Sequence, residues 1–276
     1  MPIHPTAIID KQARLADDAQ IGPGCVIQGE VTIGEGCTLI AHAHLQGPLT
    51  IGSGNTIYPF VSLGLAPQDR KFNPSILGAG ARIGNDNVLR ESVSIHRATK
   101  DKPTTIGDRN YLMACSHIGH DVQMGSDCML ANCALVGGHV QIADQVLLGG
   151  GVGIQQFTRI GRLAMVSGNS GIAKDLPPFC VSYTLRRVAS LNLVGLRRAG
   201  HRQHIPALQK AFDILYKQEH SNQTAVNLIE QELGSDPLCM EIIEFVRSGE
   251  RGIVRYGGRR SENILSSIYP EQFHES

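Results

Sequence analysis

The sequence predicts a mainly β protein: a parallel β-helix of hexapeptide repeats, with an α-helical domain behind it. Three observations predict this fold. Every sixth residue is aliphatic along most of residues 3–172, small or β-branched residues recur four positions later, and the repeat stops at a DLPP segment, residues 175–178. Neither an α-helical period of 3.6 nor simple strand alternation produces a period of six. We therefore expect a β-helix domain at residues 1–180 and a helical domain with a tail at residues 181–276.

The aliphatic positions form three runs in steps of six, at residues 3–63, 83–95 and 106–172. We expect each hexapeptide to form a short strand and a corner, with glycine and polar residues supplying the corner conformation. Three hexapeptides complete one coil, and coils stack about 4.8 Å apart. The interruptions, roughly residues 64–82 and 98–104, predict loops that leave the β-helix and that suit a functional role.

Composition narrows the class of protein. Lys+Arg and Asp+Glu are balanced at 25 each, so the net charge gives no reason to expect nucleic acid as a partner. Seven cysteines without a C-x-x-C pair favour a reducing compartment. The sequence has no run of 18 apolar residues and no signal-peptide pattern at its start. We expect a cytoplasmic protein without an integral membrane segment.

The segments after the repeat show helical periodicity, at residues 190–200, 206–220, 221–233 and 237–249. These helices can cap the open end of the β-helix. Flat faces with few aromatic residues also make a symmetric oligomer the expected state.

The coil length gathers polar residues at one edge. Residues 18 apart stack, so Asp121 should lie against His139, and His120 should share its corner with Gln156 two coils on. Correcting for the second loop, His96 falls about one coil before His120, offset by one position. The spacing therefore predicts a column of histidines, one carboxylate and one amide along an outer edge.

Such a column suits acid–base chemistry. A neutral imidazole can take a proton from a hydroxyl, and an adjacent carboxylate can fix its tautomer. Acyl transfer from a thioester also needs a donor for the developing oxyanion, and the backbone N–H groups of Gly137-Gly138 are candidates. Two different interpretations stay open at this point. The histidines can be solvated corner residues, or His96, His139 and either His117 or His120 can bind zinc.

Several motifs carry a resemblance to a known family. The segments SHIGHDVQMGSDCMLANCALVGGHVQI, GIQQF, VSGNSGIAKDLPP, APQDRKF, IGDRN and ESVSIHR are similar to those of the acyl-carrier-protein–UDP-N-acetylglucosamine O-acyltransferases, and the similarity spans roughly residues 3–250. The resemblance implies a left-handed β-helix, a homotrimer with sites between subunits, and the first step of lipid A synthesis. It implies acyl carrier protein and a UDP-sugar as partners, and no metal or other cofactor.

The resemblance also implies roles for individual residues. His120 would be the general base, Asp121 its orienting partner and Gly138 the oxyanion donor. The acyl-chain groove would contain Met113, Met165 and Gly168. The remaining matched residues would hold the sugar nucleotide: Asp69, Lys71, His117, His139, Gln156, Asn192 and Arg198.

The sequence departs from the family pattern at Val194, Ala199 and Gln155. Because two of these lie at the implied nucleotide end, a modified acceptor such as a 3-amino UDP-sugar is a competing hypothesis for the substrate. Two competing hypotheses for the class of protein are a trimeric zinc enzyme of the carbonic-anhydrase type and a non-catalytic scaffold.

Overall fold

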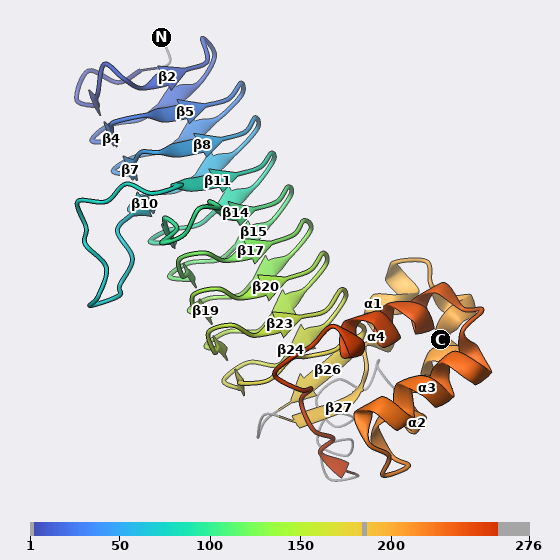
Figure 1. Cartoon of the computed structure of the whole chain (residues 1–276). Helices are drawn as coiled ribbons and strands as arrows, with labels where there is room; N and C mark the ends of the chain where they lie inside the picture. The colour runs from blue at the N-terminus through green and yellow to red at the C-terminus, as the bar shows by residue number, and fades with distance from the viewer. Residues whose placement is uncertain (1–2, 184–186, 259–276) are drawn as a thin grey trace.

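The computed structural model describes residues 3–183 and 187–258. A long three-sided parallel β-helix occupies most of this chain, and helices gather at its C-terminal end (Figure 1). The N-terminus lies at the opposite end of the β-helix. This architecture confirms the predicted fold class. The predicted tail extends into residues 259–276, which lie outside the described residues.

Successive strands pass from face to face, so each face is a parallel sheet of every third strand. The first face contains β1 (Ile8–Ile9), β4 (Val26–Gln28), β7 (His44–Gln46), β10 (Ser62–Leu65), β13 (Ser94–His96), β16 (His117–Ile118), β19 (Leu135–Val136), β22 (Gly153–Ile154) and β25 (Gly171–Ile172). The second contains β2 (Arg14–Leu15), β5 (Val31–Ile33), β8 (Leu49–Ile51), β11 (Ala81–Ile83), β14 (Thr104–Ile106), β17 (Gln123–Met124), β20 (Gln141–Ile142) and β23 (Arg159–Ile160).

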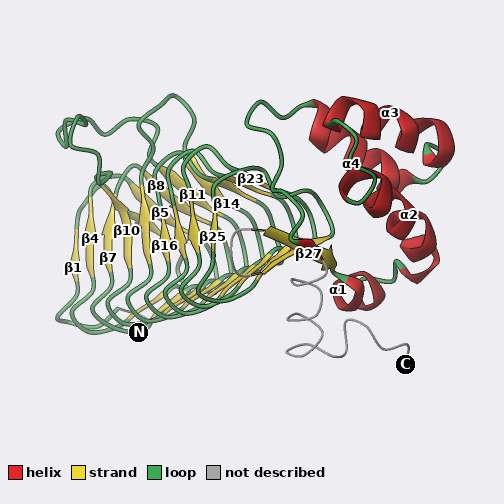
Figure 2. Ribbon diagram, turned by 90° about the horizontal axis from the view of Figure 1, so that it is seen from below, coloured by secondary structure: helices red, strands yellow, loops and turns green. Residues whose placement is uncertain are grey.

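The third face is completed by the strands that lead to the helices. It contains β3 (Gln20–Ile21), β6 (Thr38–Leu39), β9 (Thr56–Ile57), β12 (Val88–Leu89), β15 (Tyr111–Leu112), β18 (Met129–Leu130), β21 (Leu147–Leu148), β24 (Met165–Val166), β26 (Cys180–Tyr183) and the antiparallel β27 (Arg187–Leu191). Figure 2 shows how the strands stack coil upon coil.

The predicted six-residue period is the period of the core. Ile27, Leu45, Leu63, Ile95 and Ile118 are fully buried, and they stack along the first face in register. Each aliphatic side chain therefore rests on its equivalent in the next coil. This stacking explains why no polar residue interrupts the repeat: an unpaired polar group inside the stack would lose its hydration without gaining a partner.

The glycines that follow the aliphatic positions have a different role from the one predicted. A Cβ on Gly22 would lie 1.9 Å from the Ile40 carbonyl oxygen of the next coil, and a Cβ on Gly34 would lie 2.7 Å from the Gly52 carbonyl carbon. These glycines thus permit close approach between coils. The left-handed corner position comes two residues later and mostly holds other residues, including Asp121 and His139, each with φ of 60°.

Both predicted loops leave the β-helix, with slightly different bounds. The first spans residues 66–80, because Leu65 still pairs with His96 and Ala81 with Thr104. The second spans residues 97–103, between β13 and β14.

The helices follow β27. They are α1 (Leu193–Arg198), the 3-10 turn η1 (Arg202–His204), α2 (Ile205–Tyr216), α3 (Asn222–Leu233) and α4 (Pro237–Arg247). The expected helix at residues 190–200 was wrong at its start, because Ser190 pairs with Val181 across β26 and β27. Within the described ranges, no helix combines the length and apolarity needed to cross a membrane.

Candidate active site

His120 and Asp121 occupy the corner that joins β16 of the first face to β17 of the second. His120 Nδ1 lies 2.7 Å from Asp121 Oδ2. Asp121 takes the left-handed backbone conformation of its corner position, with φ of 60°. The predicted imidazole–carboxylate pair is therefore formed within one corner.

The Asp121 carboxylate is held by donors from the second loop. It accepts hydrogen bonds from the Thr99 hydroxyl at 2.6 Å and from the backbone N–H groups of Thr99 and Lys100 at 3.0 Å. Burial alone would raise the pKa of Asp121, but the hydrogen bonds from Thr99 and His120 outweigh it and lower that pKa. The ionised carboxylate only accepts hydrogen bonds, so His120 carries its proton on Nδ1 and leaves Nε2 free to act as a base.

Gly138 lies against the free side of this imidazole. A Cβ at Gly138 would stand 2.7 Å from His120 Nε2 and Cε1, so a side chain cannot fit here without moving the ring. Among the described residues, none accepts a hydrogen bond from the Gly138 N–H. The N–H is thus available to a ligand beside the basic nitrogen, which is the arrangement that oxyanion stabilisation requires.

The predicted histidine column is present. The rings of His120 and His139 meet edge to face at 5.0 Å between centroids, and His139 Nε2 lies 3.6 Å from Asp121 Oδ2. His139 also stacks on Phe157, with ring centroids 4.4 Å apart. His117, on β16 just before the corner, and His96, on β13 of the preceding coil, form another edge-to-face pair at 4.7 Å, and His117 Nδ1 lies 2.8 Å from the Ser94 hydroxyl.

Burial favours the neutral form of three of these histidines, His96, His117 and His139. Burial lowers the pKa of His96 to about 4, with further contributions from His117, His120 and Arg97. Burial lowers the pKa of His117 as well, and that of His139 despite the nearby Asp121 carboxylate. At neutral pH these three imidazoles can therefore both donate and accept hydrogen bonds.

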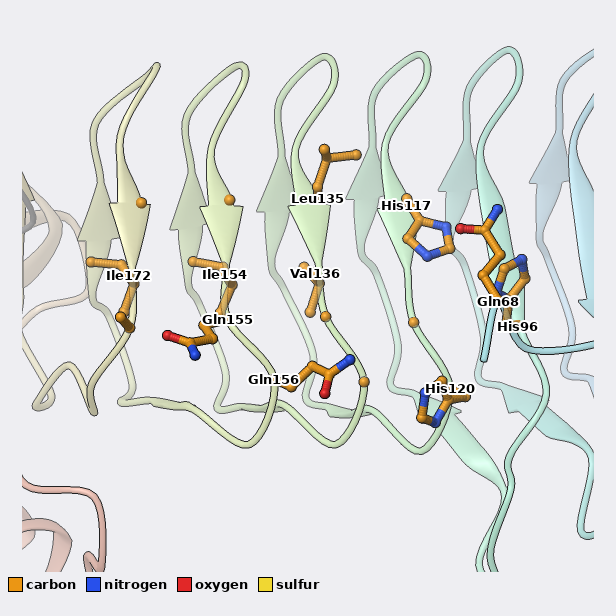
Figure 3. Close-up of a pocket in the computed structure, with 16 residues that line it drawn as sticks. Gln68, His96, His117, His120, Leu135, Val136, Ile154, Gln155, Gln156 and Ile172 are labelled. Carbon is orange, nitrogen blue, oxygen red and sulfur yellow. The ribbon is translucent and has the colours of Figure 1, made fainter. Parts of the chain in front are cut away.

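A groove of about 490 Å³ runs from this edge along the first face. His96, His117, His120 and Gln68 line one part of it (Figure 3). In the other part, Leu135, Gly153 and Gly171 continue the outward row of His117 at intervals of 18 residues, and the amide side chains of Gln155 and Gln156 lie beside this row. The glycines leave room where side chains would otherwise project. The groove thus joins an end lined by histidines to a row without polar side chains that Gln155 and Gln156 border.

Sequence reasoning missed several groove residues. The row of Leu135, Gly153 and Gly171 could have been found by adding 18 to His117. Gln68, from the first loop, gave no such signal, because the loop has no repeat that fixes its position.

The implied substrate residues are distributed over separate surfaces of the chain. Gln156 lines the groove with His120. Asp69 and Lys71 lie exposed on the first loop, where the Lys71 N–H donates to Asp69 Oδ1. Arg198 is exposed in the last turn of α1. Asn192 caps that helix by accepting the Gly195 N–H at 2.9 Å, and it donates to the Leu163 carbonyl.

The three residues implied for the acyl groove belong to the third face. Met113 follows β15, and Gly168 follows β24, which contains Met165. Met165 packs against Val181, Tyr183 and Ala189. The groove beside His120 is lined from the first face, so one chain does not bring these residues into it.

The site has one constellation of possible metal ligands in the described part of the chain. Atoms of His120, Asp121 and His139 lie within 4.8 Å of one another. The Asp121 oxygens, however, already accept hydrogen bonds from Thr99 and Lys100, which would compete with a metal ion.

Comparisons with known proteins show the family to which the chain belongs. The family described as UDP-N-acetylglucosamine O-acyltransferase, domain 2, matches residues 175–254, and the bacterial transferase hexapeptide family matches residues 103–138. An acyl-carrier-protein–UDP-N-acetylglucosamine O-acyltransferase of Thermodesulfovibrio yellowstonii is 42% identical over 257 residues, which cover 92% of this chain and 99% of that protein. The chain belongs to this family of acyltransferases. The predicted family and enzyme class are confirmed.

Solved structures of the family have the same architecture. The enzyme from Acinetobacter baumannii is 38% identical, with a TM-score of 0.88, over 92% of this chain and 100% of that one. The enzyme from Moraxella catarrhalis is 35% identical, with a TM-score of 0.87 and the same coverage. Family membership supports neither the zinc-enzyme nor the scaffold hypothesis.

Proposed function

We propose that this acyltransferase moves an acyl group, of the 3-hydroxyacyl type, from acyl carrier protein to the 3-hydroxyl of UDP-N-acetylglucosamine, the first step of lipid A synthesis. The observation that carries this proposal is the free His120 Nε2 between the fixed Asp121 carboxylate and the available Gly138 N–H. The names of the family members supply the substrates.

In the proposed reaction His120 Nε2 takes the proton as the sugar hydroxyl attacks the thioester carbonyl. The new C–O bond produces a tetrahedral oxyanion, which the Gly138 N–H stabilises. Collapse breaks the C–S bond, and the imidazolium returns its proton to the departing sulfur. An ester and the free thiol result. Asp121 remains ionised and stabilises the imidazolium.

The apolar row of Leu135, Gly153 and Gly171 suits an acyl chain that extends from the basic end of the groove. Within reach of the sugar, His117, His139 and Gln156 can donate and accept hydrogen bonds. Asp69, Lys71, Asn192 and Arg198 are proposed nucleotide or sugar contacts, and for Asn192 a structural role as helix cap competes with that assignment.

The distribution of polarity over the three faces supports the proposed homotrimer. Outward residues of the second face, including Arg14, Thr32 and Thr50, are polar and exposed. The first and third faces instead expose Ile8, Leu135 and Met129. If the first face of one copy packs on the third face of the next, Met113, Met165 and Gly168 of a neighbour can complete the acyl groove.

The seven free cysteines suit the proposed cytoplasmic location.

Mass spectrometry of the product tests the proposal. Purified enzyme receives one 3-hydroxyacyl-acyl carrier protein and either UDP-N-acetylglucosamine or its 3-amino analogue. An O-acylated product, formed faster from the hydroxyl acceptor, is expected. Preferential amide formation would favour the 3-amino acceptor suggested by Val194 and Ala199. No transfer to either sugar would refute the assignment of the acceptor.

A further inference from the structure

Arg97 is a buried cation at the base of the first loop. Arg97 directly follows His96 in the sequence, and only 1% of its surface is exposed. The guanidinium group donates five hydrogen bonds of 2.7–3.3 Å to four oxygens: Pro74 O, Gly64 O, Gln46 Oε1 and Ile76 O, which accepts two of them. The Phe72 ring lies beside it, 5.8 Å from the guanidinium carbon.

The acceptors of this cation are unusual because none of them is a carboxylate. Among the described residues Arg97 forms no ion pair within 4.0 Å, so neutral carbonyl and amide oxygens alone offset its desolvation. Burying a charge is costly unless its hydrogen bonds are satisfied. Pro74 and Ile76 contribute backbone carbonyls, so Arg97 fixes the path of the loop main chain whatever the side chains of the loop are.

The same segment touches the catalytic pair. His96 lines the groove, and Thr99 and Lys100, two and three residues beyond Arg97, hold Asp121. Gln68, on the loop that Arg97 holds, also lines the groove. Residues 96–100 therefore join the first loop to the Asp121 carboxylate through consecutive backbone positions.

We propose that Arg97 is a positioning residue that holds loop 66–80 against the groove and thereby sets the affinity for the acceptor sugar nucleotide. This inference rests on the proposed function, since the loop carries the proposed contacts Asp69 and Lys71. Proton transfer depends on His120 and Asp121, which Arg97 does not contact. Loss of the guanidinium group should consequently weaken acceptor binding more than it slows the chemical step.

The test compares Arg97→Met and Arg97→Lys with wild type, and uses Arg82→Met as a matched control. Arg82 is exposed on the second face, on β11. Steady-state kinetics give KM for UDP-N-acetylglucosamine and kcat. Limited trypsin digestion with mass spectrometry gives the rate of cleavage after Arg70 and Lys71 in the loop. Thermal unfolding and native mass report folding and assembly.

For Arg97→Met we expect KM to rise about tenfold or more, with kcat within about threefold, because several charge-assisted hydrogen bonds are lost. Cleavage in the loop should accelerate, and Arg82→Met should match wild type in both measurements. Arg97→Lys, with fewer donors, should fall between them. If the Met variant does not fold, the Lys variant carries the same comparison.

Unchanged KM and unchanged cleavage in a folded Arg97 variant would overturn the proposal, as would a fall in kcat at constant KM. The cleavage measurement needs no substrate. If wild type fails to acylate UDP-N-acetylglucosamine, the proposed function fails, while faster cleavage in the variant would still establish the anchoring of the loop.

Discussion

Gly138→Ala tests whether the position of the His120 imidazole controls the rate, because the substitution leaves the imidazole itself unchanged. The added Cβ would stand 2.7 Å from His120 Nε2, where ordinary van der Waals contact begins near 3.4 Å. The imidazole must therefore move by about 0.7 Å, or the corner must open. The Asp121 contact at 2.7 Å opposes the ring movement from the other side. Displacements of about 1 Å in a catalytic group cost on the order of 100-fold in rate, so kcat should fall by roughly 30- to 100-fold.

Gly150→Ala is the matched control. Gly150 has the same place in its hexapeptide at another edge, and its added Cβ would meet only the Asn132 carbonyl oxygen, at 3.4 Å. Steady-state acyl transfer and thermal unfolding should be measured for both variants. We expect Gly150→Ala to keep kcat within about twofold. Wild-type kcat in a folded Gly138→Ala enzyme would refute the close packing of Gly138 against the base.

Two further predictions concern the polar edge. Asp121→Asn should lower kcat by about 10²- to 10⁴-fold, since an amide no longer fixes the proton on His120 Nδ1. Thr99→Val keeps the carboxylate, so its kcat should fall much less. Equal falls in kcat for the two variants would contradict this ordering. The buried His96 should make stability depend on pH. Its folded pKa of about 4 is below the unfolded value near 6.5, so the unfolded chain binds more protons and stability is lost as pH falls through this window. The wild-type protein should lose about 2 kcal/mol more than His96→Asn between pH 7 and pH 5 in denaturant unfolding. Equal losses in both proteins would show that His96 is not held neutral.

The regular part of the molecule was predictable because each coil repeats the same geometry. The period of six identified the core, and the period of 18 stacked Asp121 on His139 and placed Gln156 near His120, since register along a stacked sheet is preserved from coil to coil. The same arithmetic would have found Leu135, Gly153 and Gly171.

Outside the repeat, the sequence did not predict the positions of the site residues. The path of loop 66–80 depends on the buried Arg97 and its carbonyl partners, which no local pattern reveals, so Gln68 was missed. The donors to Asp121, Thr99 and Lys100, were also missed, because they lie in the second loop, where no repeat fixes their positions. The role of the glycines was also mistaken, because close approach between coils at Gly22 and Gly34 is a tertiary property. Ser190 joined β27 instead of a helix because pairing with β26 outweighed its helical pattern.

The proposed mechanism depends above all on His120 as the general base, and His120→Ala tests that role. Transfer from 3-hydroxyacyl-acyl carrier protein to UDP-N-acetylglucosamine should be followed in wild type and variant at equal, saturating substrate, with native mass and thermal unfolding as controls for fold. A loss of at least 10²- to 10⁴-fold in kcat is predicted, about the typical contribution of a positioned base. A folded His120→Ala enzyme with kcat within about tenfold of wild type would contradict the mechanism.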